Sequence, residues 1–358
     1  MPSPRAVIEV DGTKVIWDDL INIKVENTLY TAADSFECTL NNSGNLSDWF
    51  KKNQEVKVYI GYMKEDALGR RANGDIWNKN ELKHIFTGKV DGIKPSFNSS
   101  KTVQLLGRDY SAPMIDTECT AAFKNASSGK IASIFAEKYG LKPIIASTSE
   151  VINTEMISRK KEWEVLQMLA DLEGYVCYVT KNKELYFGPR STGDDIVSDT
   201  LYYNYVEKDV KANCVIEFDD STIGVINTVT VKNWNRKSSN IVKASAKNDF
   251  LIKAMGQVKE RVFYNPKVKS VGQAAAQAKK LLDEYSRSVI TASGTRMPGN
   301  PELFAECKVQ VFGCSRFDGL YYMDKVTHSL DKSAGYINEF QITNLRPENS
   351  QQYRQDLY

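Results

Sequence analysis

The chain contains almost no histidine and no closely spaced cysteine motif. Only His84 and His328 occur among its 358 residues, so any histidine-based site must use one of these two. The six cysteines lie far apart, at positions 38, 119, 177, 214, 307 and 314, and none of them forms a C-x-x-C. Lone cysteines in strand-like segments are usually small buried hydrophobes. The sequence therefore predicts a chain made in a reducing cytoplasm, without a disulfide framework.

Long apolar runs and an excess of one charge are missing as well. No segment approaches the roughly 18 apolar residues that cross a bilayer, so we expect no membrane insertion. The N-terminal stretch MPSPRAVIEVDG enters an alternating strand directly and is not expected to be a signal peptide. With 47 basic and 45 acidic residues the formal charge is +2, and the lysine pairs are scattered. No basic face, and hence no specific nucleic-acid partner, is predicted.

The familiar catalytic and phosphate-binding motifs are also absent. G-x-S-x-G, H-E-x-x-H and G-x-G-x-x-G do not occur. The stretch NASSGKI resembles a phosphate loop, but Lys124 stands where the first glycine belongs and Ile131 where Ser or Thr must bind magnesium. We interpret it as the beginning of a helix.

The remaining polar candidates do not combine into a site. Asp194-Asp195 and Asp219-Asp220 are adjacent carboxylates in turn-like contexts, whereas an acid/base pair needs two carboxylates that converge on one bond. Along a strand, Asp324 lies about 13 Å from His328 and cannot orient its ring. The sequence thus predicts no catalytic, cofactor-binding or metal-binding residue, no cofactor, and a protein that is not an enzyme.

Alternating segments dominate the first part of the chain. The stretch VIEVDGTKVIW (7–17) predicts a hairpin around Asp11-Gly12, and five further strands follow before residue 110. About seven short strands in about 105 residues favour a barrel or sandwich. The charged, glycine-punctuated stretch between 63 and 82 is long for a compact domain, and we interpret it as a partner-contacting loop.

The pattern becomes helical after residue 126. Two apolar stripes with helical spacing, each followed by glycine, predict helices over 127–139 and 162–173. A hairpin turning at 181–183 follows. From about residue 204 alternating strands resume, interrupted by one predicted helix over 270–286.

These patterns predict a mainly β fold with an α/β insert, in which two β domains flank a small α+β domain. The expected boundaries are residues 1–115 for the first β domain and 116–200 for the insert. The second β domain, with its one helix, takes 201–346, and 347–358 form a polar tail.

Four segments, in this order, resemble the late-control protein D family of phage tails. They are IFTGKVDGI (85–93), LLGRDYSAPMIDTE (105–118), the stretch from Trp163 to Phe187, and the closing stretch 296–342 with its Pro-Gly turn and its histidine-bearing strand. The family comprises baseplate hub proteins of contractile tails: phage hubs of the T4 type, hubs of tail-like bacteriocins and the N-terminal part of type VI secretion VgrG proteins.

The resemblance implies that the two β domains are related β-barrel (tube-like) domains. Three chains would then form a non-enzymatic homotrimeric ring of six barrels, which adapts a six-fold tail tube to a three-fold spike. Its partners would be further copies of the chain, the tail tube protein, the central spike protein and other baseplate proteins. The protein would assemble in the bacterial cytoplasm and end in a phage baseplate or a released tail-like particle. His328 would be a barrel-wall residue.

Two alternatives stay open. A glycan- or receptor-binding β protein at the tip of the particle is suggested by the aromatic stretch LYYNY (201–205). A cell-wall hydrolase would have to draw its acids from Glu217, Asp219 or Asp220, and it is the less favoured of the two.

Overall fold

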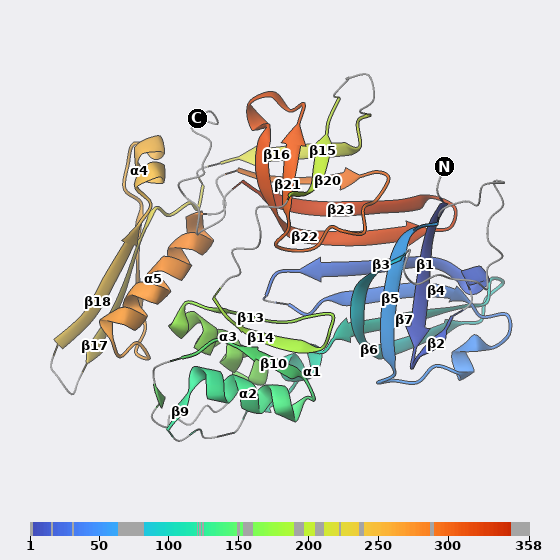
Figure 1. Ribbon diagram of the computed structural model, residues 1–358, viewed down its shortest axis with the longest axis horizontal. Coiled ribbons are helices and arrows are strands. Elements are labelled where there is room, and N and C mark those ends of the chain that lie inside the picture. The colour runs from blue at the N-terminus through green and yellow to red at the C-terminus, as the bar shows by residue number, and fades with distance from the viewer. Residues whose placement is uncertain are drawn as a thin grey trace.

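The computed structural model describes residues 3–344, apart from 16, 31, 64–81, 120, 122, 124, 149–150, 153–159, 190–196, 205–210, 222, 236–239 and 287–289. The predicted loop between 63 and 82, the pair Asp194-Asp195 and the polar tail therefore lie outside the described residues. The chain is mostly β, and antiparallel pairing prevails in one 13-stranded sheet. The predicted fold class is confirmed (Figure 1).

The first β unit is built from the first seven strands. They are β1 (Ser3–Val10), β2 (Thr13–Lys14), β3 (Leu20–Thr28), β4 (Ser35–Asn41), β5 (Glu55–Met63), β6 (Leu82–Ser96) and β7 (Thr102–Asp109). Their order in the sheet is β3-β4-β7-β6-β5-β1-β2. The inward residues of these strands enclose one core, which includes Val25, Phe36 and Phe86. The short 3₁₀ turns Trp17–Asp19 and Leu46–Asp48 lie in its connections.

The second β unit is built from six strands of the last third of the chain. They are β15 (Val197–Tyr202), β16 (Cys214–Asp220), β20 (Ile290–Arg296), β21 (Lys308–Phe312), β22 (Gly319–Asp331) and β23 (Gly335–Thr343). The pairing order is β16-β20-β23-β22-β21-β15. A separate core, which includes Tyr321 and Phe340, lies inside this unit. A 3₁₀ turn (Ser315–Phe317) precedes β22.

The two β units repeat one topology. Taken in chain order, β1, β3, β4, β5, β6 and β7 correspond to β15, β16, β20, β21, β22 and β23, and each strand has the corresponding neighbours. One difference is that β15 pairs with β21 in parallel, whereas β1 pairs with β5 antiparallel. The chain therefore contains two copies of one architectural unit.

A β-bulge occurs at the same place in both units. In β6 the register shifts between Val90 and Gly92, and in β22 between Met323 and Lys325. The skipped residue is Asp91 in one case and Asp324 in the other. Bulges of this kind are positioned features that redirect a strand.

The backbone on the partner strand is also the same at both bulges. Asn53 N donates to Val90 O at 2.8 Å, and Glu306 N donates to Met323 O at 2.7 Å. Asn53 and Glu306 both have positive φ, at 68° and 77°. This match makes Val90 equivalent to Met323 and fixes the alignment of the two repeats.

The two units join edge to edge through β3 and β22. Residues 325–331 of β22 pair antiparallel with 22–28 of β3, so that Val25 lies opposite His328. Figure 1 shows these two strands side by side at the middle of the molecule, with β16 above them and β6 below. The result is a continuous run of eight strands, β16-β20-β23-β22-β3-β4-β7-β6.

Helices and short strands outside the two β units share a third core. The insert contains α1 (Ala112–Asp116), α2 (Ser128–Lys138) and α3 (Glu162–Glu173), with the hairpin β13 (Val176–Val179) and β14 (Glu184–Gly188). Its other strands are β8 (Glu118–Cys119), β9 (Ala126–Ser127), β10 (Lys142–Ile145), β11 (Val151–Ile152) and β12 (Lys160–Lys161). The same core takes in β17 (Thr228–Asn235), β18 (Asn240–Lys247), β19 (Glu260–Tyr264) and α5 (Val271–Ser286). These last elements interrupt the second β unit between β16 and β20.

Most predicted elements are found, with one correction. The three predicted helices correspond to α2, α3 and α5, and the hairpins around Asp11-Gly12 and 181–183 are present. The expectation of a single helix within 201–346 is wrong, because α4 (Asp249–Met255) precedes β19. Asn248 caps this helix through its side chain and Gly256 ends it in the left-handed conformation. All six cysteines are free.

Candidate functional site: the polar face of the eight-stranded run

Side chains alternate along a strand, so the eight-stranded run has one face on the cores and one polar face. Across the junction, cross-strand neighbours on the polar face form rows. One row runs through Thr327, Glu26, Ser35 and Arg108, and the next through Ser329, Lys24, Glu37 and Leu106. The polar face therefore crosses from one β unit into the other without a break.

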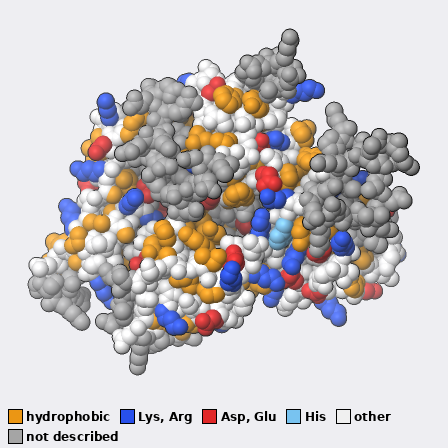
Figure 2. Space-filling view, viewed as in Figure 1, with side chains coloured by type: hydrophobic (Ala, Val, Ile, Leu, Met, Phe, Trp, Pro, Cys, Tyr) orange, Lys and Arg blue, Asp and Glu red, His pale blue; other side chains and the backbone are white. Residues whose placement is uncertain are grey.

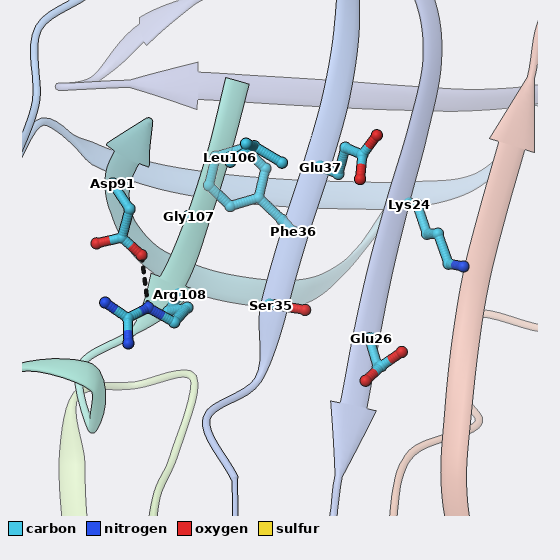
Figure 3. A pocket seen from close by; sticks show the side chains of 9 residues that line it. All are labelled: Lys24, Glu26, Ser35, Phe36, Glu37, Asp91, Leu106, Gly107 and Arg108. Atoms are coloured by element: carbon cyan, nitrogen blue, oxygen red, sulfur yellow. Dashed lines mark hydrogen bonds and ion pairs between the residues drawn. The ribbon is translucent and has the colours of Figure 1, made fainter. Parts of the chain in front are cut away.

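A shallow pocket of about 370 Å³ lies on this face, over β3, β4, β6 and β7. Figure 3 shows the side chains of its nine lining residues: Lys24, Glu26, Ser35, Phe36, Glu37, Asp91, Leu106, Gly107 and Arg108. Gly107 is required here, since a Cβ would lie 2.1 Å from Lys89 O and 2.4 Å from the Phe36 ring.

Charged groups on this face are paired with one another. Arg108 Nε lies 2.7 Å from Asp91 Oδ2, and its Nη2 lies 2.7 Å from Asp116 Oδ2. These carboxylates raise the pKa of Arg108 above its usual value, and Arg108 in turn lowers the pKa of Asp116. At the junction, Lys325 Nζ lies 2.9 Å from Glu26 Oε2. Such pairs suit a solvated, charge-balanced wall.

The acids that line the pocket on the polar face are engaged by cations or amides, as in the 2.5 Å hydrogen bond that Gln104 Nε2 donates to Glu37 Oε1. No histidine lines the pocket, and within the described part of the chain no three metal-ligating side chains come together. Figure 2 shows side chains of both charge signs intermixed over the surface it presents, with hydrophobic side chains gathered near α3 and β13.

His328 lies behind this face, in a buried polar cluster. It is 2% exposed, and its Nε2 lies 3.1 Å from Leu303 O. Because a carbonyl only accepts, Nε2 carries the proton and Nδ1 accepts from Tyr336 Oη at 2.6 Å and Asn338 Nδ2 at 3.0 Å. Burial lowers the pKa of His328 to about 4, so the ring is neutral.

The same cluster fastens the connection before β21 to the sheet. Asn338 Oδ1 accepts from Asn300 N at 2.5 Å, and Gly299 N donates to Tyr336 O at 2.8 Å. Tyr62 of the first β unit donates its hydroxyl to Gly299 O at 2.8 Å. These contacts give a structural reason for histidine at position 328.

A larger cavity of about 600 Å³ lies between the sheet, the insert and residues 301–308. Asp34 and Asp109 line it and lie beside one another, and Asp34 N donates to Asp109 Oδ2 at 3.4 Å. Burial, together with the Asp109 charge, raises the pKa of Asp34 to about 7, and burial raises the pKa of Asp109 to about 6. Both carboxyls receive hydrogen bonds from neighbours, from Thr28 N and Asn27 Nδ2 on one side and Ser111 N on the other.

The structure separates the residues that were weighed as chemical candidates. Ser127 accepts from Lys130 N at 3.3 Å as the N-cap of α2, so the segment NASSGKI begins a helix. Asp219 and Asp220 end the edge strand β16, where Asp220 pairs with Arg316 at 2.8 Å. His84 stacks on Tyr59 at 4.9 Å, far along the sheet from these acids.

Two related β domains were expected, but the sequence did not identify which strands correspond, nor the polar face that depends on that correspondence. A signal was present, since QEVKVY (54–59) and CKVQVF (307–312) occupy equivalent strands, as do VDGI (90–93) and MDKV (323–326). These matches are short and are separated by more than 230 residues. The matched segments can be recognised as parts of one repeated unit only once the pairing of β3 with β22 is known.

Solved structures of two tail proteins and of a type VI secretion component have a similar fold. A 43 kDa tail protein of prophage MuSo2 from Shewanella oneidensis superposes with a TM-score of 0.70 at 18% identity, covering 97% of this chain and 99% of that one. A tail protein from Neisseria meningitidis superposes with a TM-score of 0.71 at 14% identity, and the match covers 96% of this chain and 97% of that one. A component of the type VI secretion system of E. coli superposes with a TM-score of 0.56 at 12% identity, and the match covers 94% of this chain and 76% of that one.

These likenesses, at identities far below 25%, show that the chain has the fold of phage tail proteins over nearly its whole length. A scan of protein-family models and a search of curated proteins found no match. In the described part of the chain no helix has both the length and the apolar character needed to cross a membrane.

Proposed function

We propose that the protein is a structural hub of a contractile tail or tail-like particle, in which three copies form a ring between a six-fold tail tube and a three-fold spike. The observation that carries the proposal is the repeated β unit. A ring of three chains with two equivalent units each has six equivalent positions and still has true three-fold symmetry. Such a ring matches a six-fold partner on one side and a three-fold partner on the other.

The polar face of the eight-stranded run suits the wall of a central channel. It is continuous across β22 and β3, and its charges are paired rather than of one sign. In a closed ring this face would line the channel, and the cores would lie behind it. The partners are then other copies of the chain, the tail tube protein, the central spike protein and other baseplate proteins.

The function is proposed to be geometric rather than enzymatic. The acids considered for a cell-wall hydrolase, Glu217, Asp219 and Asp220, lie along one exposed edge strand and do not face one another across a cleft. The proposed domains are the two β units, with the insert from α1 to β14 between them. Assembly in the bacterial cytoplasm followed by incorporation into a baseplate or a released particle follows from this role.

Electron microscopy tests the proposal on the purified chain, alone and co-expressed with its candidate spike. Three-fold rings with a central channel and a pseudo-six-fold outline are the expected result. Monomers in both preparations would contradict it. In that case glycan binding by the isolated chain, suggested by the aromatic stretch 201–205, becomes the next hypothesis to measure.

A further inference from the structure

The eight-stranded run ends in two open edges. At one end β16 pairs only with β20 among the described residues. At the other end, β6 pairs with β5 through residues 82–89, whereas from Asp91 to Ser96 it pairs only with β7 within the described chain. Open strand edges bind other strands unless something prevents it.

The molecule already contains one example of the contact that these edges can make. The open half of β6 is equivalent to residues 324–329 of β22, and β16 is equivalent to β3. Within one chain β22 pairs with β3. The same contact between β6 of one copy and β16 of the next copy would continue the sheet from chain to chain.

The register follows from the repeat, beginning at the bulge of the first unit. Val90 pairs with Gly107, Gly107 with Phe36, and Phe36 with Val25 of β3.

In the second unit the equivalent path begins at Met323. This residue pairs with Ile342, Ile342 with Ala292, and Ala292 with Phe218 of β16. Phe218 therefore stands where Val25 stands in the first unit, and the residues around it follow in the same order.

The residue pairs between β22 and β3 therefore predict the residue pairs between β6 of one copy and β16 of the next. Thr327 lies opposite Glu26, and Ser329 lies opposite Lys24. Counted from the two bulges, the equivalents of these pairs are Lys94 opposite Asp219 and Ser96 opposite Glu217.

We propose that residues 92–97 of β6 pair antiparallel with residues 216–221 of β16 in a neighbouring copy, with Lys94 opposite Asp219. This inference rests on the proposed hub function and names the surfaces that would close its ring. A single head-to-tail contact of this kind, repeated, generates a closed ring when the rotation fits.

The side chains of the two edges are complementary, whereas Pro95, which would lie opposite Phe218, has no N–H to donate to the new pair. Asp219 and Glu217 are exposed on β16, and Lys94 is exposed on β6. Charges on an edge strand oppose indiscriminate pairing, but opposite charges in register select one partner. On the core side of the contact, Phe97 is 67% exposed in the single chain and would lie opposite Ile216. The contact would therefore cover an apolar side chain that the single chain leaves in water.

A disulfide cross-link tests the register. Residues directly opposite in antiparallel strands have Cα atoms about 4.5–5.5 Å apart, within the range that a disulfide spans. Ser96→Cys together with Glu217→Cys should give a covalent trimer on oxidation with copper phenanthroline, seen in non-reducing electrophoresis. The matched control, Ser96→Cys with Asp220→Cys, places its second cysteine on the other face of β16 and should not cross-link.

A charge exchange tests the pair itself. Lys94→Asp or Asp219→Lys alone should weaken ring formation about 10-fold, since like charges then lie opposite one another. The double variant should restore it, because opposite charges meet again in the reversed order.

The outcomes separate the interface from the hub function. Cross-linked trimers and rescue by the double variant support the proposal. Rings without the cross-link and without any effect of the charge reversals would overturn the proposed interface while leaving the hub function intact. Monomers in all preparations would overturn both.

Discussion

His328 accepts a hydrogen bond from the Tyr336 hydroxyl across the β22–β23 pair, at 2.6 Å, and donates through its other nitrogen to the Leu303 carbonyl. One neutral ring thus links three segments of the second β unit. The contacts give a structural reason for a histidine in this strand.

Replacing this ring should destabilise the fold. His328→Ala leaves Tyr336 and Leu303 without their buried partner and creates a cavity, so we expect a loss of about 3 kcal/mol in the free energy of unfolding. Urea denaturation measures it. Ser329→Ala, a neighbour on the polar face, should change stability by less than about 0.5 kcal/mol. Equal stability of the two variants would contradict the proposed role of the cluster.

The same ring should make the protein sensitive to acid. With a pKa of about 4 in the folded chain, His328 stays neutral while the unfolded chain takes up a proton below pH 6.5. The contribution of His328 to the free energy of unfolding is therefore present above pH 6.5 and is lost as the pH falls towards 4. His328→Gln, which can make similar hydrogen bonds but does not titrate, should lose stability less steeply over this range.

The carboxyl pair Asp34 and Asp109 should have the opposite effect on how the free energy of unfolding depends on pH. Their raised pKa values, about 7 and about 6, mean that the folded chain holds protons that the unfolded chain releases above pH 4. Their contribution is present below pH 4 and is lost as the pH rises to 7. Asp109→Asn removes the repulsion, so its stability relative to wild type should rise by on the order of 1–2 kcal/mol between pH 4 and pH 8. Asp48→Asn, at an exposed position, is the control and should show no such trend.

Two glycines should be irreplaceable where strands approach closely. A Cβ on Gly107 would lie 2.1 Å from Lys89 O, and one on Gly294 would lie 2.2 Å from Val215 O. We expect Gly107→Ala and Gly294→Ala each to cost about 1–3 kcal/mol, because backbone must move to make room. Gly44→Ala, with nothing within 4 Å, should be tolerated. Thermal denaturation of the three variants distinguishes these expectations.

The polar face and the open edge should differ in accessibility after assembly. Lys24→Cys lies on the face proposed to line a water-filled channel and should react with a small thiol reagent at similar rates in monomer and ring. Lys94→Cys lies in the proposed interface and should be protected at least tenfold once rings form. Protection of both or of neither would argue against this arrangement of faces.

Much of the local structure could be predicted from the sequence, because periodicity reports local burial. The helix α3 combines an apolar stripe with a C-terminal glycine in the left-handed conformation, and both signals are local. The helix α4 was missed although Asn248 and Gly256 mark its ends, because it has only seven residues and lies among strands. The strands β18 and β19 were also not predicted.

The site could not be predicted, because it depends on contacts between distant segments. The partners of His328 include Leu303, 25 residues away, and the neighbouring strand residue Val25, some 300 residues away. The periodicity of the sequence does not predict such contacts between distant residues. The bulges at Asp91 and Asp324 can be recognised as equivalent only once the pairing of both strands is known.

The mass of the assembled particle tests the central claim most directly. Native mass spectrometry of the chain at micromolar concentration, alone and co-purified with its spike, should give a species of three times the 40.3 kDa chain, with the bound spike in the second case. A species of 40.3 kDa in both preparations would contradict the ring.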